Sequence, residues 1–282
     1  MNIQIIIPAH NEEAYLEETL TSLVTQSFLP KKIVVVNDHS TDDTQAIITR
    51  FSKKYDLVQG VQNTSKAKHE PGSKVVAAFY KGLEKIDSTY DIVCKFDADL
   101  IFPKNYLEKI AALFHQNPIV GMAGGFCYIK KNNQWVLENL TNNDHIRGAL
   151  KAYRKECFEQ IGGLKKAMGW DTIDELLAQY HGWNIATDEN LHVHHLKPTG
   201  TTYTKAAKYK QGKAFYQMRY GWSLTQIAAI KLAQRKASIS FYYNCMRGYQ
   251  KAKQNQTPYL VTPEEGEFIR QLRWKNIKKK LF

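Results

Sequence analysis

Short apolar runs recur along the N-terminal third of the chain, and the segments between them show helical periodicity. Ile3–Ile7 and Ile92–Phe96 are apolar almost throughout, which predicts strands that are buried on both faces. Lys32–Val36 predicts another buried strand, and Val58–Val61 predicts a weaker one. Apolar residues recur every three or four positions in the intervening segments, which predicts helices over residues 11–24, 41–51 and 75–86.

This alternation of strands and helices predicts βαβ units, and therefore a parallel sheet. Ligands of such sheets bind at the carboxyl ends of the strands. Polar residues follow three of the predicted strands directly, namely Asn11, Asp38 and the pair Asp97 and Asp99. We therefore expect these side chains to lie along one edge of the sheet.

The chain beyond Pro103 predicts a less regular set of elements. A glycine-rich segment, residues 120–129, indicates a bulged strand or a close approach of two backbones. One predicted helix ends at Gly162-Gly163, a pair typical of helix C-termini. The predicted helices are residues 106–114, 146–161 and 171–181, the predicted short strands are 183–186 and 191–195, and the chain beyond Gly200 has a helical pattern.

The composition is ordinary for a soluble globular protein, with 43% hydrophobic and 23% charged residues in a chain of 282. No apolar run approaches the roughly 20 residues that a membrane helix needs. The first residues lack the basic segment and cleavage site of a secretory signal. The four cysteines are far apart and lack metal-ligand spacing, so we expect reduced thiols in a cytoplasmic protein and give no weight to the sequons at Asn63 and Asn139.

The net charge of +12 is concentrated at the C-terminal end. Residues 205–282 hold 17 Lys and Arg against 3 Glu, whereas residues 1–204 hold 22 Lys and Arg against 24 Asp and Glu. A slightly acidic N-terminal part argues against a nucleic-acid binder, which needs a continuous basic face. The basic part is also aromatic, and residues 223–236 predict an amphipathic helix with Leu224, Ile227 and either Ile230 or Lys231 bounding its apolar stripe. We expect this extension to dock on an anionic membrane surface, the alternative being that its aromatic residues pack on the rest of the protein.

Two carboxylates, Asp97 and Asp99, follow the strand Ile92–Phe96 with one residue between them. Residues two apart in a strand point the same way, so both can face one ligand. Carboxylate oxygens suit Mg²⁺, which completes its coordination with substrate phosphates. The alternative for an isolated pair of this kind is a turn with two solvated aspartates.

With these segments in order, the chain resembles the family 2 glycosyltransferases of GT-A fold from Ile3 to about Gly200. The shared motifs are the opening IIIPAHNEE, VVVNDHSTDDT, FDAD, the glycine pair before an acidic helix, and the late histidines. The resemblance implies an α/β nucleotide-binding α/β/α sandwich with a mostly parallel sheet, plus a basic helical C-terminal extension. It divides the chain into a catalytic domain, residues 1–204, and the extension, residues 205–282. Within the catalytic domain, a nucleotide-sugar half would cover about residues 1–103 and an acceptor half about residues 104–204.

The resemblance also implies which residues bind the nucleotide-sugar donor. Asp38 would read the nucleobase, with UDP-sugars favoured, although it could instead cap a turn or helix. Pro8, Ala9 and Asn11 would form the adjoining wall. Lys74 would neutralise phosphate charge, unless it is an exposed lysine in the first turn of a helix.

The metal site is implied in the same way. Asp97 would face the ribose or the metal shell, and Asp99 would ligate Mn²⁺ or Mg²⁺ under the donor diphosphate. His195 is the expected third ligand and His194 the second choice, because side chains alternate along a strand and one of the two faces the site.

The general base is where the sequence departs from the family pattern. Relatives carry Glu-Asp at the start of a helix, and here Trp170 replaces the glutamate before Asp171. Asp171 keeps the spacing, and Asp174 lies one helical turn further on, so both remain candidates. Trp170 is a candidate platform for stacking an acceptor sugar, and Arg147 is expected near the acceptor and the diphosphate, unless it belongs to a solvated helix face.

The resemblance implies an inverting, metal-dependent glycosyltransferase that makes a polysaccharide or glycolipid. Its partners would be a nucleotide-sugar donor, a saccharide or lipid-linked acceptor and an anionic membrane at the inner face of the cell membrane, but no nucleic acid. A metal-dependent nucleotidyltransferase is the rival enzyme class. Such enzymes carry an early basic, glycine-rich phosphate loop, and the corresponding segment here, PAHNEEAYLEE, is acidic.

Overall fold

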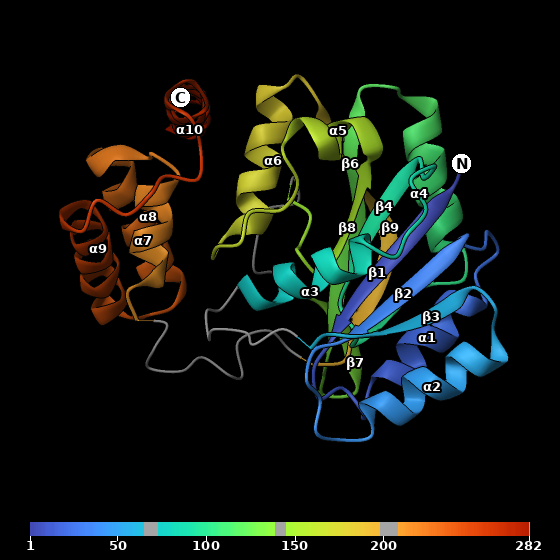
Figure 1. The fold of residues 1–282 in the computed structure, drawn as a ribbon. Coiled ribbons are helices and arrows are strands. Elements are labelled where there is room, and N and C mark those ends of the chain that lie inside the picture. Colours follow the sequence, from blue (N-terminus) through green and yellow to red (C-terminus); the bar gives the residue numbers. More distant parts are fainter. Residues whose placement is uncertain (65–72, 139–144, 198–207, 282) are drawn as a thin grey trace.

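A computed structural model describes residues 1–64, 73–138, 145–197 and 208–281 of the chain (Figure 1). Asn139 and the expected domain boundary at residue 204 lie outside these residues. The elements are β1 Ile3–Ala9, α1 Leu16–Val24, β2 Lys32–Asn37, α2 Thr44–Lys54, β3 Val58–Gln62, α3 Ser73–Leu83, β4 Ile92–Phe96, β5 Leu100–Ile101, α4 Tyr106–Gln116, β6 Val120–Lys131, β7 Gln134–Leu137, β8 Leu150–Arg154, α5 Lys155–Gln160, α6 Trp170–Tyr180, β9 Asn184–His195, α7 Lys210–Gln217, α8 Gly221–Arg235, α9 Ile239–Gln254 and α10 Pro263–Leu281.

The sheet has the strand order β3-β2-β1-β4-β8-β6-β9-β5, with β7 paired to β6. Strands β3, β2, β1 and β4 are mutually parallel, as the alternating apolar pattern predicts. Beyond β4 the sheet is mixed, because β8 runs antiparallel to both β4 and β6 while β9 is parallel to β6. The α/β fold class is confirmed, and the mostly parallel arrangement describes its N-terminal half.

The prediction of a helix over residues 146–161 is wrong for the first part of that range. Leu150–Arg154 forms β8, and Lys155–Gln160 alone is helical. The segment contains good helix formers such as Lys151 and Ala152, but hydrogen bonding to β4 on one side and β6 on the other overrides that local preference.

A single long strand, β9, replaces the two short strands predicted near residues 183–195. It follows β6 for most of its length, with one register shift between Val120 and Met122 and another between Gly124 and Phe126. A Cβ at Gly125 would lie 2.4 Å from the carbonyl oxygen of Leu191, so the glycine-rich sequence permits the close backbone approach that was expected there. The far end of β9 pairs with β5, which sets His195 opposite Leu100.

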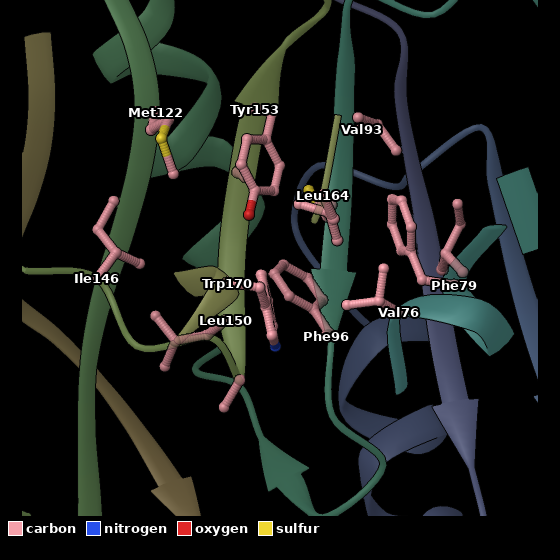
Figure 2. Packing of buried hydrophobic residues seen from close by; sticks show 14 of the residues in the cluster. Val76, Phe79, Val93, Phe96, Met122, Ile146, Leu150, Tyr153, Leu164 and Trp170 are labelled. Atoms are coloured by element: carbon pink, nitrogen blue, oxygen red, sulfur yellow. The ribbon is translucent and has the colours of Figure 1, made fainter. Parts of the chain in front are cut away.

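The hydrophobic core lies on both faces of the sheet. Ile5, Ile6 and Ile7 point alternately to opposite faces, yet each is fully buried, so helices cover both sides (Figure 1). Figure 2 shows side chains of β4, β8 and α6 in this core, including Tyr153 and Trp170. The resulting rigid sheet holds the strand ends at which the polar residues lie.

The C-terminal helices α7–α10 form a group beside α6 (Figure 1). Their aromatic residues pack mainly on one another: the rings of Phe215 and Tyr220 stack at 5.0 Å, and those of Tyr216 and Tyr249 meet edge to face at 5.6 Å. Tyr180 of α6 meets Phe268 of α10 at 5.5 Å. The extension therefore has its own aromatic core, which neither of the two expectations for these residues foresaw.

Candidate active site

The polar residues that follow the strands gather at one end of the sheet, around Asp97 and Asp99. These two residues connect β4 to the short strand β5. The backbone N–H of Leu196 donates to the carbonyl oxygen of Asp99 at 2.9 Å, so the end of β9 is fixed against this connection. The pairing brings together Asp99 and His195, which are far apart in the sequence.

Asp99 and His195 form the buried centre of this site. Their side chains are 10% and 5% exposed, and Asp99 Oδ2 lies 3.4 Å from His195 Nε2. The other ring nitrogen, Nδ1, lies 2.8 Å from Oε2 of Glu138. Because a carboxylate can only accept, Nδ1 donates its proton to Glu138, and the Nε2 of a neutral ring then turns a lone pair toward Asp99. A positive ion between Nε2 and Asp99 would satisfy both acceptors.

Glu138 directly follows β7, the strand after the β6–β7 turn, and sequence reasoning missed it. Its side chain is 4% exposed and also accepts a hydrogen bond from Arg147 Nη1. Its backbone N–H donates to the carbonyl oxygen of Cys127 at 2.9 Å. Ligand atoms of Cys127, Glu138 and His195 lie within 4.8 Å of one another. Burial raises the pKa of the Cys127 thiol to about 12, so this cysteine stays protonated beside the histidine.

Glu12 is a second residue of the site that the sequence did not single out. Its Oε1 accepts a hydrogen bond from Lys197 at 3.3 Å. Burial, and then the charge of Asp99, raise the pKa of Glu12 to about 7, although Lys197 opposes the shift. Glu12 lies in the turn between β1 and α1, which begins at Leu16.

The donor atoms fit a hard divalent cation. Asp99 Oδ1 and Glu12 Oε2 are buried, and neither has a hydrogen-bond partner within the described parts of the chain. A buried carboxylate oxygen without a partner costs free energy. Oxygen ligands of this kind, with an imidazole beside them, are the set that Mg²⁺ or Mn²⁺ takes in proteins.

Asp97 has a different environment from Asp99. Its side chain is 36% exposed and its Oδ1 accepts a hydrogen bond from the buried Lys95, two residues earlier on β4. Lys95 also donates to the carbonyl oxygen of Gly148 at 2.9 Å, and its ammonium lies 5.5 Å from the ring of Trp170. Lys95 therefore connects Asp97, which is predicted to bind the nucleotide-sugar donor, to Trp170 at the start of α6.

The two candidate bases on α6 differ sharply in exposure. Asp171 is 34% exposed, with Oδ2 at 4.0 Å from His145 Nε2. Asp174 is 1% exposed; its oxygens accept hydrogen bonds from Lys151 at 2.8 Å and from Tyr153 at 2.6 Å. Burial raises the pKa of Asp174 to about 6, against the opposing charge of Lys151. Asp174 is thus enclosed by partners, whereas Asp171 reaches the surface.

Trp170, the expected acceptor platform, is buried. It is 6% exposed, and a Cβ at Gly148 would lie 2.8 Å from its ring. The tryptophan therefore packs beneath the site and has no open face for stacking a sugar. This packing also explains a glycine at position 148, where any side chain would meet the indole ring.

The expected nucleobase contact, Asp38, lies at the end of β2 and is 8% exposed. Its Oδ1 accepts a hydrogen bond from Asn63 Nδ2 at 2.8 Å and lies 3.0 Å from His39 Nδ1. Its backbone N–H donates to the carbonyl oxygen of Ala9 at 2.8 Å, which joins the ends of β1 and β2. Pro8 precedes this contact on β1.

Asn11 fixes the turn that follows β1. It has a positive φ of 55°, and its Oδ1 accepts the backbone N–H of Thr41 at 2.8 Å. Asparagine tolerates this left-handed conformation better than most residues. The residue therefore connects two loops at the edge of the site. It lies before α1, which begins at Leu16 and not at residue 11 as predicted.

Lys74 and His194 lie at the margin of the assembled group. Lys74 is in the first turn of α3 and is partly exposed, directly after residues outside the described part of the chain. The ring of His194 stacks on Trp135 at 3.8 Å, on the strand face opposite to that of His195. Alternation along β9 therefore places one histidine of the pair at Asp99, as expected.

In open α/β sheets ligands bind at the carboxyl ends of the strands, which is where the carboxylates that follow β1, β2 and β4 lie. The profile of the family described as Glycosyl transferase family 2 matches residues 4–165, which is more than half of the chain. The chain belongs to this glycosyltransferase family.

Several curated proteins are similar to parts of the chain. A probable glycosyltransferase, YdaM of Bacillus subtilis (strain 168), is 35% identical over 119 residues, which cover 40% of this chain and 25% of that protein. An uncharacterized glycosyltransferase of Mycoplasma pneumoniae is 28% identical over 178 residues, with 58% and 56% covered. The poly-beta-1,6-N-acetyl-D-glucosamine synthase of Staphylococcus epidermidis is 27% identical over 125 residues, with 44% and 28% covered. The matches thus span a quarter to just over half of the relatives' own lengths.

Solved structures share the fold at low sequence identity. S. aureus TarS in complex with UDP-GlcNAc has a TM-score of 0.56 and 18% identity, with 83% of this chain and 67% of that chain covered. The mannosyltransferase PcManGT from Pyrobaculum calidifontis, in complex with GDP-Man and Mn²⁺, has a TM-score of 0.58 and 16% identity, with 100% and 81% covered. These likenesses establish the GT-A fold of the chain.

Proposed function

We propose that the chain is an inverting glycosyltransferase that moves a sugar from a nucleoside-diphosphate donor to a hydroxyl of a saccharide or lipid-linked acceptor. The observation that carries the proposal is the buried pair Asp99 and His195 at the strand ends, where a carboxylate oxygen and an imidazole nitrogen face each other at 3.4 Å. A UDP-sugar and the synthesis of a polysaccharide or glycolipid are favoured, because TarS is described with UDP-GlcNAc and the S. epidermidis relative is a polysaccharide synthase.

Asp99 and His195, with Asp97 beside them, are the residues that would hold Mn²⁺ or Mg²⁺. The buried Asp99 Oδ1 without a partner in the described regions supports this assignment, and the PcManGT structure is described with Mn²⁺. A bound ion would supply positive charge that stabilises the diphosphate as it leaves the sugar. We assign the ligand to His195, because the ring of His194 stacks on Trp135.

The donor nucleoside would lie across the ends of β1 and β2. Asp38 would accept a hydrogen bond from a base N–H, while Asn63 holds its carboxylate in place at 2.8 Å. Pro8, Ala9 and Asn11 would form the wall beside the base. Lys74, at the start of α3, would approach the diphosphate, because a helix N-terminus and a lysine both favour negative charge.

Asp171 would be the general base that takes the proton from the acceptor hydroxyl. An inverting transfer needs a carboxylate on the side opposite to the leaving group, and such a group must be reachable by the acceptor. Asp171 is 34% exposed, whereas Asp174 is enclosed by Lys151 and Tyr153. Arg147 would act behind the metal site through Glu138.

A donor-hydrolysis assay tests this proposal. UDP-GlcNAc, UDP-glucose and GDP-mannose are incubated with the protein and with Mn²⁺, Mg²⁺ or EDTA, and release of the nucleoside diphosphate is measured. We expect turnover of at least one donor with metal and none in EDTA. Activity that EDTA leaves unchanged would contradict the metal assignment, and no turnover or binding of any donor would contradict the function.

The C-terminal extension would dock the enzyme on an anionic membrane from the cytoplasmic side. Of the described residues, none forms a helix that is long and apolar enough to cross a membrane. Ile227, Ile230 and Ile239, which lie on α8 and α9, are 38%, 48% and 76% exposed, in a segment that carries a charge of +14. Leu224 is buried, so the exposed stripe is narrower than the sequence suggested.

Liposome co-sedimentation tests the docking. We expect binding to vesicles with anionic lipid that weakens as salt is added. Replacing Ile230 and Ile239 with Ser should reduce the binding, whereas the same change at Ile119, which is 51% exposed on the other part of the chain, should not. Equal binding to neutral vesicles, or none to anionic ones, would contradict this part of the proposal.

A further inference from the structure

We propose that Glu138 is a positioning residue that sets the tautomer and the orientation of His195 toward Asp99. The inference rests on the proposed metal-dependent transfer, because its purpose is to keep Nε2 of His195 available as a ligand. Three contacts carry it, joining Arg147 to Glu138, Glu138 to His195, and His195 to Asp99 in one row.

The first step is the tautomer of His195. Nδ1 lies 2.8 Å from Glu138 Oε2, and both side chains are nearly fully buried. An ionised carboxylate has no proton to donate, so the hydrogen bond requires a proton on Nδ1. In a neutral ring Nε2 then has a lone pair, and this is the nitrogen that lies 3.4 Å from Asp99. A carboxylate behind the histidine thus prepares the opposite nitrogen to bind a cation.

The second step is what holds the Glu138 carboxylate in place. A buried carboxylate without partners is strongly unfavourable. Arg147 donates to the same oxygen that accepts from His195, and a guanidinium provides fixed positive charge. The backbone of Glu138 is held as well, through its N–H bond to Cys127 at 2.9 Å. Each contact therefore restricts where the carboxylate can lie.

The third step is the origin of these residues in the fold. Glu138 follows β7, which returns along β6 through a turn at Asn132 and Asn133, both with positive φ. Strand β6 pairs with β9, and Ile129 stands opposite His195 in that register. The β6–β7 hairpin thus places the carboxylate of Glu138 beside Nδ1 of His195, which is 57 residues away in the sequence.

Nuclear magnetic resonance of the ring nitrogens of the metal-free protein tests the tautomer directly. At a pH where the ring of His195 is neutral, we expect the proton on Nδ1 in the wild-type protein. Glu138→Ala should shift the population toward the form with the proton on Nε2, which can donate to Asp99. Glu138→Gln should restore the wild-type signature, since its amide oxygen can still accept from Nδ1. A wild-type proton on Nε2, or no change in Glu138→Ala, would overturn the inference.

Titration with Mn²⁺ alone, followed by electron paramagnetic resonance, gives a second readout. We expect Glu138→Ala to weaken Mn²⁺ binding by about 10–100-fold, and to have no further effect when His195 is already Ala. Equal weakening in both backgrounds would show a merely structural role and overturn the inference. A wild-type protein that binds no Mn²⁺ but keeps the proton on Nδ1 would instead contradict the proposed function and leave the positioning intact.

Discussion

Two acidic clusters, one around Asp174 and one around Asp99, lie within the part of the chain that the structure describes, and they differ in their hydrogen bonding. Around Asp174, the carboxylate oxygens are all occupied: those of Asp174 accept from Lys151 and Tyr153, and those of Glu175 accept from Lys151, Ile146 and His145. Around Asp99, by contrast, Oδ1 of Asp99 and Oε2 of Glu12 have no partner within the described ranges. All the carboxylate oxygens of one cluster thus have hydrogen-bond partners, whereas two buried carboxylate oxygens of the other have none among the described residues.

This difference in hydrogen bonding indicates that one cluster stabilises the fold and the other binds a ligand. A closed network contributes to folding, because each charge already has its partner and no atom is left to bind a ligand. An open cluster carries unfavourable free energy that a bound cation would remove. Predictions that remove one carboxylate at a time can therefore separate the clusters, since loss in one should affect activity and loss in the other should affect stability.

The largest effect is expected at Asp99. Asp99→Asn keeps the shape of the side chain but removes the charge that would hold the metal. We expect turnover of the preferred donor to fall by about three orders of magnitude or more, because the metal contributes several kcal/mol of charge stabilisation. The free energy of unfolding without metal should be unchanged or higher. A variant that keeps its activity, or that loses stability instead, would reverse the roles of the two clusters.

Asp174 should show the opposite result. Asp174→Ala leaves Lys151, whose side chain is fully buried, without its nearest carboxylate. Breaking a buried ion pair in this way costs about 3–5 kcal/mol, and we expect that loss in urea unfolding at neutral pH. Asp171→Ala is the matched control on the same helix and should change stability little. Loss of turnover in Asp174→Asn without loss of stability would identify Asp174 as the base.

The sequence predicted most strands of the sheet, but it predicted only some of the residues in the Asp99 and Asp174 clusters. The strand Ile92–Phe96 was predicted with its observed ends, because a buried parallel strand has a continuous apolar run. Nothing local marks Glu138 or Glu12, since their roles depend on strand pairings that join segments far apart in the chain. Lys151 appeared to belong to a helix, and its place in β8 follows from pairing with strands on both sides and from burial beside Asp174.

A smaller effect is expected at Asp171, the exposed carboxylate beside the closed cluster. Asp171→Asn removes the proton acceptor and keeps the size of the side chain. Turnover should fall by about 100-fold or more, within the usual range for a lost general base, while donor affinity and stability stay close to the wild-type values. Steady-state kinetics with a separate measurement of donor binding would check this. Weaker donor binding at unchanged turnover would place Asp171 in the donor site instead.

The smallest effect is expected in the open cluster, where Glu12 should make the free energy of unfolding depend on pH. The pKa of Glu12 is raised from 4.5 to about 7 in the folded protein, first by burial and then by Asp99. The folded state therefore holds a proton that the unfolded chain has released. The free energy of unfolding of the metal-free protein should accordingly fall as the pH rises from about 4.5 through about 7.

Glu12→Gln should remove this dependence and be more stable than the wild-type protein above neutral pH, by on the order of 2–3 kcal/mol. Urea unfolding at acidic and at alkaline pH, with and without Mn²⁺, measures the effect. Mn²⁺ should stabilise the wild-type protein most at the alkaline end, because the ion replaces the proton that Glu12 loses there. If the free energy of unfolding depends on pH equally in both proteins, then burial and Asp99 do not destabilise the ionised Glu12 carboxylate. The open cluster would then differ from the closed one in geometry alone.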